Sequence, residues 1–271
     1  MTAMKTTQCC VVALVLLAAT GAGDRPANAG RVAGAGAAVA ENPASATLPR
    51  FAVFGWVSPP KAFASAERYA ELAEAGFNVT VLAWEDSGRV EDNLARLEWT
   101  RPLGVRNLLY DHDLSKIESG PGFEPWADTV VARYRDDPAF LGYYLGDEPE
   151  LGEFGRNARL FRLLRERDPV HPAWNNLRGR QAFVTRDEWL EYTRAYVDSV
   201  QPAVLCNDQY DFMRTGDRNE QVENVAGLAA VAREHGLPFW GIVLLVEHGT
   251  FRAFTPRAQP SRGEVGLAHR G

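Results

Sequence analysis

The stretch Phe140-Leu-Gly-Tyr-Tyr-Leu-Gly-Asp-Glu-Pro-Glu150 decides the fold of this chain. Its apolar, aromatic-rich first part is too short and too rich in β-favouring residues for a core helix, so it predicts a buried strand. The run stops at Asp147-Glu148-Pro149. Carboxylates are thereby placed at the C-terminal end of the strand, where parallel α/β folds keep their chemistry. The alternative is a purely structural role, in which Asp147 caps the next helix and Pro149 and Glu150 lie in its first turn.

Six further strand-like runs alternate with helical segments along the chain. The strand-like runs lie at 51–57, 77–84, 105–111, 171–177, 203–210 and 238–246. Helical patterns with caps or stop residues lie between some of them, at 66–75, 187–200 and 219–235. This alternation predicts a parallel sheet, either doubly wound or closed as a (β/α)8 barrel. The first strand is followed by Val57-Ser58-Pro59-Pro60 and not by a glycine fingerprint, which disfavours dinucleotide binding, and polar residues at every strand end favour the barrel.

The composition indicates an ordinary globular domain and excludes some partners. The chain has 271 residues, of which 46% are hydrophobic, so it can bury a sizeable core. Its formal charge of −6 is spread over interspersed acids and bases without a run of like charges. This pattern argues against nucleic acid or an anionic membrane as the main partner. We expect the barrel domain to span residues 49–255.

The N-terminus resembles a secretory signal. Lys5 precedes an apolar core over 9–19, and Ala27-Asn28-Ala29 is a small-x-small cleavage candidate. We expect residues 1–29 to be a signal peptide, a disordered linker over 30–48, and a secreted or periplasmic mature chain. A membrane-anchored N-terminal helix is the alternative. Removal of 1–29 leaves Cys206 as the only cysteine, which excludes a disulfide framework.

The repeat spacing predicts a barrel that is incomplete at its C-terminus. An eighth strand would begin near position 270, but residues 248–271 are rich in Arg, Pro and Gly and show no strand pattern. We expect about seven βα units followed by an irregular tail over 256–271, as in a truncated or frameshifted reading of a longer gene. A natural variant that another chain completes is the alternative. An unclosed barrel would leave open strand edges, which favour aggregation.

The residues that follow the predicted strands suit a sugar. In a barrel they converge at one mouth, where aromatic faces can cover the C–H side of a sugar ring while amides and acids bond its hydroxyl groups. We expect substrate contacts from Trp56, Trp84, Asp111, Asp147, Asn175, Asn176, Asp208, Tyr210 and His248.

Two carboxylates on opposite sides of one mouth are the minimum for glycoside hydrolysis, because one protonates the leaving oxygen while the other attacks the anomeric carbon or activates water. Glu148 and Glu247 are the best-placed pair. Residues 51–60, the motif at 142–149 and the segment 238–249 resemble the large clan of (β/α)8 glycoside hydrolases. The resemblance implies that Glu148 is the acid/base and Glu247 the nucleophile of a retaining enzyme without a cofactor. That clan usually carries Asn before the acid/base, where this chain has Asp147.

Two other functions fit the same sequence. Asp111, His112 and Asp113, together with Asp208 and His248, could hold the metal ion of a metal-dependent hydrolase. Alternatively, the chain could be a carbohydrate-binding or degenerate barrel that keeps an aromatic cleft without turnover. Sugar, linkage and oligomeric state are not encoded in the spacing of these residues.

Overall fold

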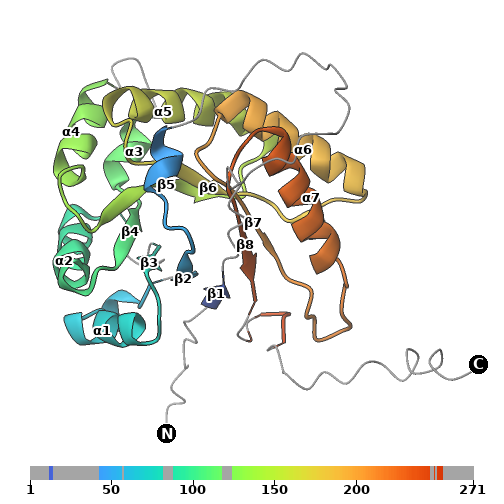
Figure 1. Cartoon of the computed structure of the whole chain (residues 1–271), viewed down its shortest axis with the longest axis horizontal. Helices are drawn as coiled ribbons and strands as arrows, with labels where there is room; N and C mark the ends of the chain where they lie inside the picture. The colour runs from blue at the N-terminus through green and yellow to red at the C-terminus, as the bar shows by residue number, and fades with distance from the viewer. Residues whose placement is uncertain are drawn as a thin grey trace, which may run out of the picture.

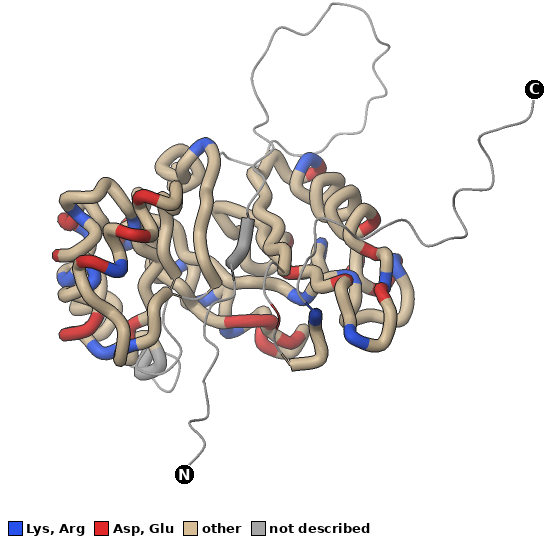
Figure 2. Tube along the Cα trace, turned by 90° about the horizontal axis from the view of Figure 1, so that it is seen from below, with Lys and Arg blue, Asp and Glu red and all other residues tan. Residues whose placement is uncertain are grey.

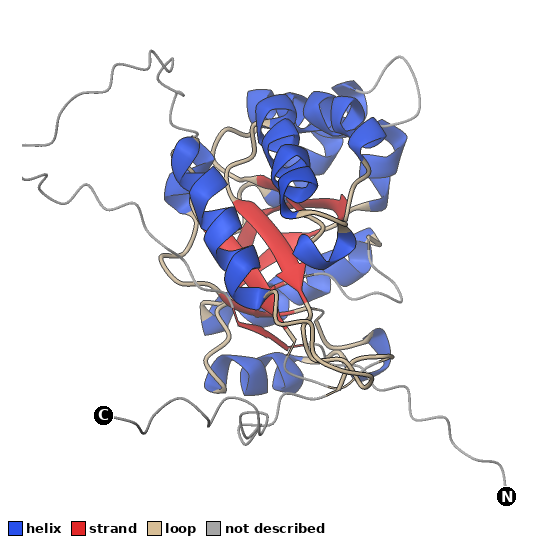
Figure 3. Cartoon of the chain, turned by 90° about the vertical axis from the view of Figure 1, so that its right-hand side faces the viewer, coloured by secondary structure: helices blue, strands red, loops and turns tan. Residues whose placement is uncertain are grey.

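The computed structural model describes residues 12–14, 43–56, 58–81, 88–117, 124–244, 247 and 249–252. Within them the chain is an α/β protein whose curved parallel sheet is surrounded by helices (Figures 1 and 3). The described strands pair as part of a (β/α)8 barrel, which confirms the predicted α/β fold class.

All of the predicted strand-like runs contain a strand. Strands β2 to β6 pair in parallel and in sequence order, and β7 pairs in parallel with β8. A parallel bridge between Leu177 and Asn207 connects the two groups. The bounds are Val53–Gly55 for β2, Val79–Thr80 for β3, Arg106–Leu109 for β4, Phe140–Asp147 for β5, Ala173–Asn176 for β6, Leu205–Gln209 for β7 and Phe239–Val243 for β8.

The helices follow the strands as the sequence pattern predicts. The predicted helices at 66–75, 187–200 and 219–235 correspond to α1 (Ala66–Glu74), α6 (Arg186–Val200) and α7 (Gln221–Glu234). Helix α6 begins with a capping box, in which the Thr185 hydroxyl accepts from the Glu188 N–H and the Glu188 carboxylate accepts from the Thr185 N–H. The remaining helices are α2 (Val90–Thr100), α3 (His112–Ile117), α4 (Glu124–Tyr134) and α5 (Phe154–Arg167). No helix among the described residues is long and apolar enough to cross a membrane.

The segments before β2 differ from a plain leader and linker. Strand β1 (Val12–Leu14), inside the predicted signal, pairs antiparallel with β2 and also contacts β8. Residues Pro43–Thr47, inside the predicted linker, form the short helix η1. The Ser45 hydroxyl there donates to the Ala203 carbonyl at 2.6 Å, and Arg106 donates to the Thr47 carbonyl at 2.8 Å. Residues 43–47 therefore contact β4 and the segment before β7, while the predicted tail over 256–271 lies outside the described residues.

Two buried clusters share the sheet. The inner cluster comes from the concave side of the strands and has Trp174 at its centre, with ring contacts to Tyr144 at 5.1 Å, Phe54 at 6.1 Å and Trp240 at 6.1 Å. The outer cluster joins the other side of the strands to helices α2 to α7. Because successive strand residues point to opposite faces, one strand supplies both clusters.

Gly142 in β5 allows the backbone before β6 to approach closely. A Cβ atom at this position would lie 2.2 Å from the carbonyl oxygen of Pro172, a backbone atom that cannot move away easily. The neighbouring Tyr143 N–H donates to that same carbonyl at 2.8 Å. The contact therefore sets the spacing of β5 and β6 on the N-terminal side of Asp147 and Glu148.

We expect Gly142→Ala to destabilise the protein by about 1–3 kcal/mol, because the added methyl group forces the two strands apart. The matched control is Gly152→Ala, where a Cβ would meet nothing within 4 Å. Urea denaturation of the two variants measures the difference. Equal midpoints would show that the strands accommodate the methyl group.

Candidate active site

The end of β5 makes an unusual backbone turn that presents Glu148. Gly146 has φ 133° and Glu148 has φ 44°, and the pairing of β5 with β6 shifts register between Tyr144 and Asp147. A positive φ is uncommon for a residue with a side chain and costs free energy that the surrounding structure must offset. Such strain is concentrated at functional sites. Glu148 is half-buried, so its carboxyl group remains accessible.

Neighbouring groups hold this turn in place. The Glu148 N–H donates to the Asn176 carbonyl at 2.8 Å, and the Tyr192 hydroxyl of α6 donates to the Pro149 carbonyl at 2.7 Å. Glu150, and not Asp147, caps the next helical turn, η4 (Leu151–Glu153), in a capping box with Glu153. The interpretation that Asp147 is the cap is therefore wrong, because Asp147 is still the last residue of β5.

Asp147, Glu148 and Asp208 gather at the carboxyl end of the sheet, and we call these three residues the acidic cluster. The Asn176 side-chain amide donates to Asp147 at 3.0 Å and to Asp208 at 3.1 Å. Three of the predicted substrate-binding residues are thus brought together beside Glu148. Tyr210 also lies here, because its hydroxyl hydrogen-bonds the Asp208 carboxyl.

Burial and like charge raise the pKa values of two carboxyl groups, Asp208 and Asp147. Asp208 is 8% exposed, and its burial, followed by the charges of Glu148 and Asp147, raises its pKa to about 7. Partial enclosure by the protein and then the charge of Glu148 raise the pKa of Asp147 to about 6, although Asp147 also reaches solvent. The pH dependence of stability should therefore come chiefly from the buried Asp208. A carboxyl group that still holds a proton near neutral pH is suited to proton transfer.

Asn175 supports the turn from the opposite side. Its amide nitrogen donates to the Gly146 carbonyl at 3.1 Å, and its amide oxygen accepts from the Tyr196 hydroxyl of α6 at 3.1 Å. Adjacent residues of β6 therefore have different environments, since Asn176 faces the acidic cluster and Asn175 faces the helices. The structure does not bring Asn175 to the cluster.

Trp56 is part of the inner cluster. It is 5% exposed and packs edge-on against Tyr144 at 5.6 Å and Trp174 at 5.9 Å. The predicted contacts from Trp84 and His248 lie outside the described residues.

Asp111 lies in the loop between β4 and α3, and His112 and Asp113 are the first residues of α3. Arg133 of α4 makes ion pairs with Asp111 at 2.9 Å and with Asp113 at 2.6 Å, and the Tyr134 hydroxyl donates to Asp111 at 2.6 Å. Asp111 is 1% exposed, so these bonds attach α4 to the loop after β4. In the described part of the chain, no group of three His, Cys, Asp or Glu side chains could hold a metal ion.

Glu247 follows β8 and is exposed. Its carboxylate makes an ion pair with the exposed Arg214, in a loop where Met213 and Phe251 form an antiparallel bridge. The structure places Glu247 after the strand that the sequence predicts, with Arg214 as its described partner.

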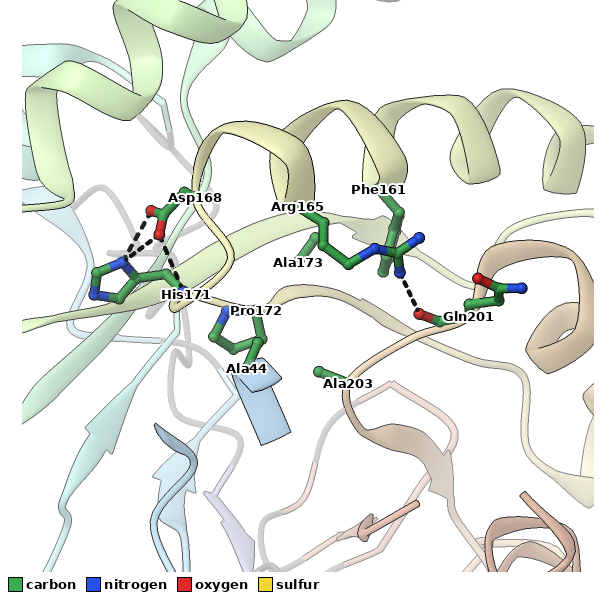
Figure 4. Close-up of a pocket in the computed structure, with 9 residues that line it drawn as sticks. All are labelled: Ala44, Phe161, Arg165, Asp168, His171, Pro172, Ala173, Gln201 and Ala203. Atoms are coloured by element: carbon green, nitrogen blue, oxygen red, sulfur yellow. Dashed lines mark hydrogen bonds and ion pairs between the residues drawn. The ribbon is translucent and has the colours of Figure 1, made fainter. Parts of the chain in front are cut away.

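A small pocket lies at the opposite, amino end of the sheet, and the hydrogen bonds beside it have a structural role (Figure 4). Asp168 lies there, 4% exposed, and accepts from the Tyr143 hydroxyl at 2.7 Å and from the His171 N–H at 3.2 Å. The His171 ring nitrogen lies 2.9 Å from the same carboxylate. These bonds connect β5 to the loop before β6, so they strengthen the fold at the end remote from the acidic cluster.

Two features of the site have no direct signal in the amino-acid sequence. The positive φ of Glu148 depends on the register shift between β5 and β6, which a single strand pattern does not encode. The supporting hydroxyl groups of Tyr192 and Tyr196 come from α6, where their spacing of four residues indicates only a buried helix face. Gly146 directly before two acids was the available signal for a special backbone.

No protein-family model and no curated protein matches this sequence. Among solved structures, the chain is similar to the Bacteroides uniformis β-glucuronidase 2 covalently bound to cyclophellitol-6-carboxylate aziridine, with a TM-score of 0.43 and 15% identity over 67% of this chain and 23% of that one. A plant β-glucan endohydrolase matches with a TM-score of 0.42 and 12% identity, over 60% of this chain and 56% of that one. The catalytic domain of a mannanase from Streptomyces sp. SirexAA-E matches with a TM-score of 0.39 and 15% identity, over 66% of this chain and 69% of that one.

These structural neighbours are glycoside hydrolases, and the chain spans about a quarter of the length of the β-glucuronidase. At such identities and TM-scores the function of this chain has to be argued from its own site.

We expect Glu148→Gly to raise the free energy of unfolding, or leave it unchanged, because glycine relieves a strain of about 1–3 kcal/mol. The matched control is Glu191→Gly, at an exposed position inside α6, which should lose about 1 kcal/mol. Chemical denaturation measures both. A loss at position 148 as large as at 191 would show that the turn stores no strain.

The raised pKa of Asp208 also predicts how stability depends on pH. In the unfolded chain the Asp208 carboxyl group ionises near pH 4, whereas its pKa in the folded chain is about 7, so the folded state binds more protons in between. The free energy of unfolding should therefore fall as pH rises from about 4 to about 7, by on the order of 3 kcal/mol for Asp208. Asp208→Asn should flatten this fall in urea titrations. An unchanged slope in the variant would contradict the assignment.

Proposed function

We propose that this chain is a glycoside hydrolase that acts by the retaining, two-glutamate mechanism on an oligo- or polysaccharide. The observation that carries the proposal is the strained backbone of Glu148, which presents a half-buried carboxyl group beside Asp147 and Asp208 at the carboxyl end of a parallel sheet. The protein around this turn maintains an unfavourable conformation, which is expected where a side chain must be aimed at a reacting group.

In this mechanism Glu148 donates its proton to the glycosidic oxygen as the bond to the anomeric carbon breaks. Glu247 attacks that carbon and forms a glycosyl-enzyme, and Glu148 then takes a proton from the water that releases the sugar. A retaining reaction requires a carboxyl separation of about 5–5.5 Å when the substrate is bound. Asp147, Tyr210 and His248 would bond the sugar hydroxyl groups, and no cofactor takes part.

The residues of the metal-dependent alternative have other roles. Arg133 makes ion pairs with both Asp111 and Asp113, so these carboxylates would have to exchange an ion pair for a metal ion. Asp208 lies in the acidic cluster, where its carboxyl group accepts a hydrogen bond from the Asn176 amide. The contacts therefore favour the metal-free reaction, which metal analysis of the purified protein tests.

The proposed setting is extracellular or periplasmic, with a carbohydrate as the partner and no nucleic acid or membrane contact. Acidic and basic residues are interspersed along the described part of the chain (Figure 2), a mixture that supports a partner other than nucleic acid or an anionic membrane. Detection of the mature N-terminus after export tests the predicted cleavage behind Ala29.

We expect measurable turnover of a panel of aryl glycosides, and Glu148→Gln should lower kcat by about 10²–10⁴ because the proton donor is lost. Glu150→Gln is the matched control, since Glu150 caps η4 and bonds Arg178 but takes no part in the reaction. Glu247→Gln should be as damaging as Glu148→Gln, and the first product should keep its anomeric configuration by NMR.

Sugar affinity without turnover in wild type and in Glu148→Gln would instead identify a binding protein. Turnover that survives Glu148→Gln would refute the proposed acid/base.

A further inference from the structure

Asn176 contacts the Glu148 turn in two ways at once. Its backbone carbonyl accepts the Glu148 N–H at 2.8 Å, and its side-chain amide donates to the Asp147 carboxylate at 3.0 Å. The two contacts fix consecutive residues of the turn that includes the positive φ of Glu148. Any rotation of the Asn176 amide would replace the donor by an oxygen that faces a carboxylate, so the orientation of this amide matters to the turn.

Asp208 helps to set that orientation, together with the Cys206 thiol, which donates to the Asn176 amide oxygen with a sulfur–oxygen distance of 3.7 Å. The Asp208 carboxyl oxygen accepts the second hydrogen of the same amide at 3.1 Å. A flipped amide would lose both bonds, whereas the observed one satisfies both carboxyl groups. Asp208 is thus connected to the turn through a single residue, Asn176, although it is distant from Glu148 in sequence.

The backbone of Asp208 is itself tightly placed. A Cβ atom on Gly179 would lie 1.9 Å from the Asp208 carbonyl oxygen, so the loop after β6 packs directly on the end of β7. The Leu177 N–H donates to the Cys206 carbonyl at 2.9 Å and anchors the same two segments. Asp208 therefore acts from a rigid position, as a residue that orients others must.

From these contacts we propose that Asp208 is a positioning residue, which aims Glu148 by fixing the amide of Asn176. The inference rests on the proposed function only in treating Glu148 as the reacting group. Asp208 acts as a hydrogen-bond acceptor, so either protonation state of its carboxyl group, or an amide oxygen in its place, can perform the role. The titratable groups that act on Asp208 within the described structure are Asp147, Glu148 and Tyr210.

The test compares Asp208→Asn, which keeps an acceptor oxygen, with Asp208→Ala, which removes it. The first measurement is hydrogen exchange of the Glu148 backbone amide, and it needs no substrate. We expect Asp208→Ala to accelerate this exchange by about fivefold or more, the loss of roughly one hydrogen bond, and Asp208→Asn to restore protection.

The second measurement is turnover. Asp208→Ala should lower kcat with little change in KM, because binding survives while the acid is misaligned. Asp208→Asn should recover most of that kcat. If Asp208→Asn is as inactive as Asp208→Ala while the Glu148 amide stays protected, Asp208 itself reacts and the positioning role is wrong.

The matched control is Asp168→Ala, which removes a buried, hydrogen-bonded aspartate at the other end of the sheet. After correction for global stability, exchange at Glu148 should match wild type. Unchanged exchange at Glu148 in Asp208→Ala would overturn the proposal. If wild type turns over no glycoside, the proposed function fails, while the exchange measurement still decides the role of Asp208.

Discussion

The backbone turn at Gly146–Glu148 is the constraint on which the site depends. The turn begins where the register of β5 with β6 shifts. The positive φ angles of Gly146 and Glu148 then turn the backbone away from the direction of the strand. Asn176 holds it from β6 and Tyr192 supports it from α6. Because these two supports come from the sheet and from the outer helix layer, the site is only as stable as the packing between those layers.

The strands were predictable because each is a short apolar run that ends in turn-forming or polar residues, and seven such runs are difficult to arrange as anything except a parallel sheet. The side-chain partners were not predictable in the same way. Asp111 follows a strand and has the right chemistry for a site, but Arg133, far along the chain, pairs with it and makes it structural. Such a pairing depends on how α4 packs, which the local sequence does not encode.

The adjacent residues Asn175 and Asn176 show most clearly what the sequence alone does not predict. They have the same side chain at the end of the same strand, and both were predicted to bind substrate. The alternation of a strand directs one toward the helices and the other toward the acidic cluster. The period of the strand predicts that the two differ, but only the observed register of β6 shows which one lies beside Glu148.

The inner aromatic cluster gives the protein an optical property of its own. The Trp174 ring centroid lies 5.1 Å from that of Tyr144, 5.9 Å from that of Trp56 and 6.1 Å from that of Trp240, with the ring planes tilted or edge-on. Aromatic rings fixed in this way produce near-ultraviolet circular dichroism, a signal that vanishes when specific packing is lost. Tyr144 is two residues before Gly146, so the spectroscopic centre of the molecule adjoins the turn. Events at the carboxyl end of the sheet should therefore be visible as changes in the chiral absorption of the unlabelled protein.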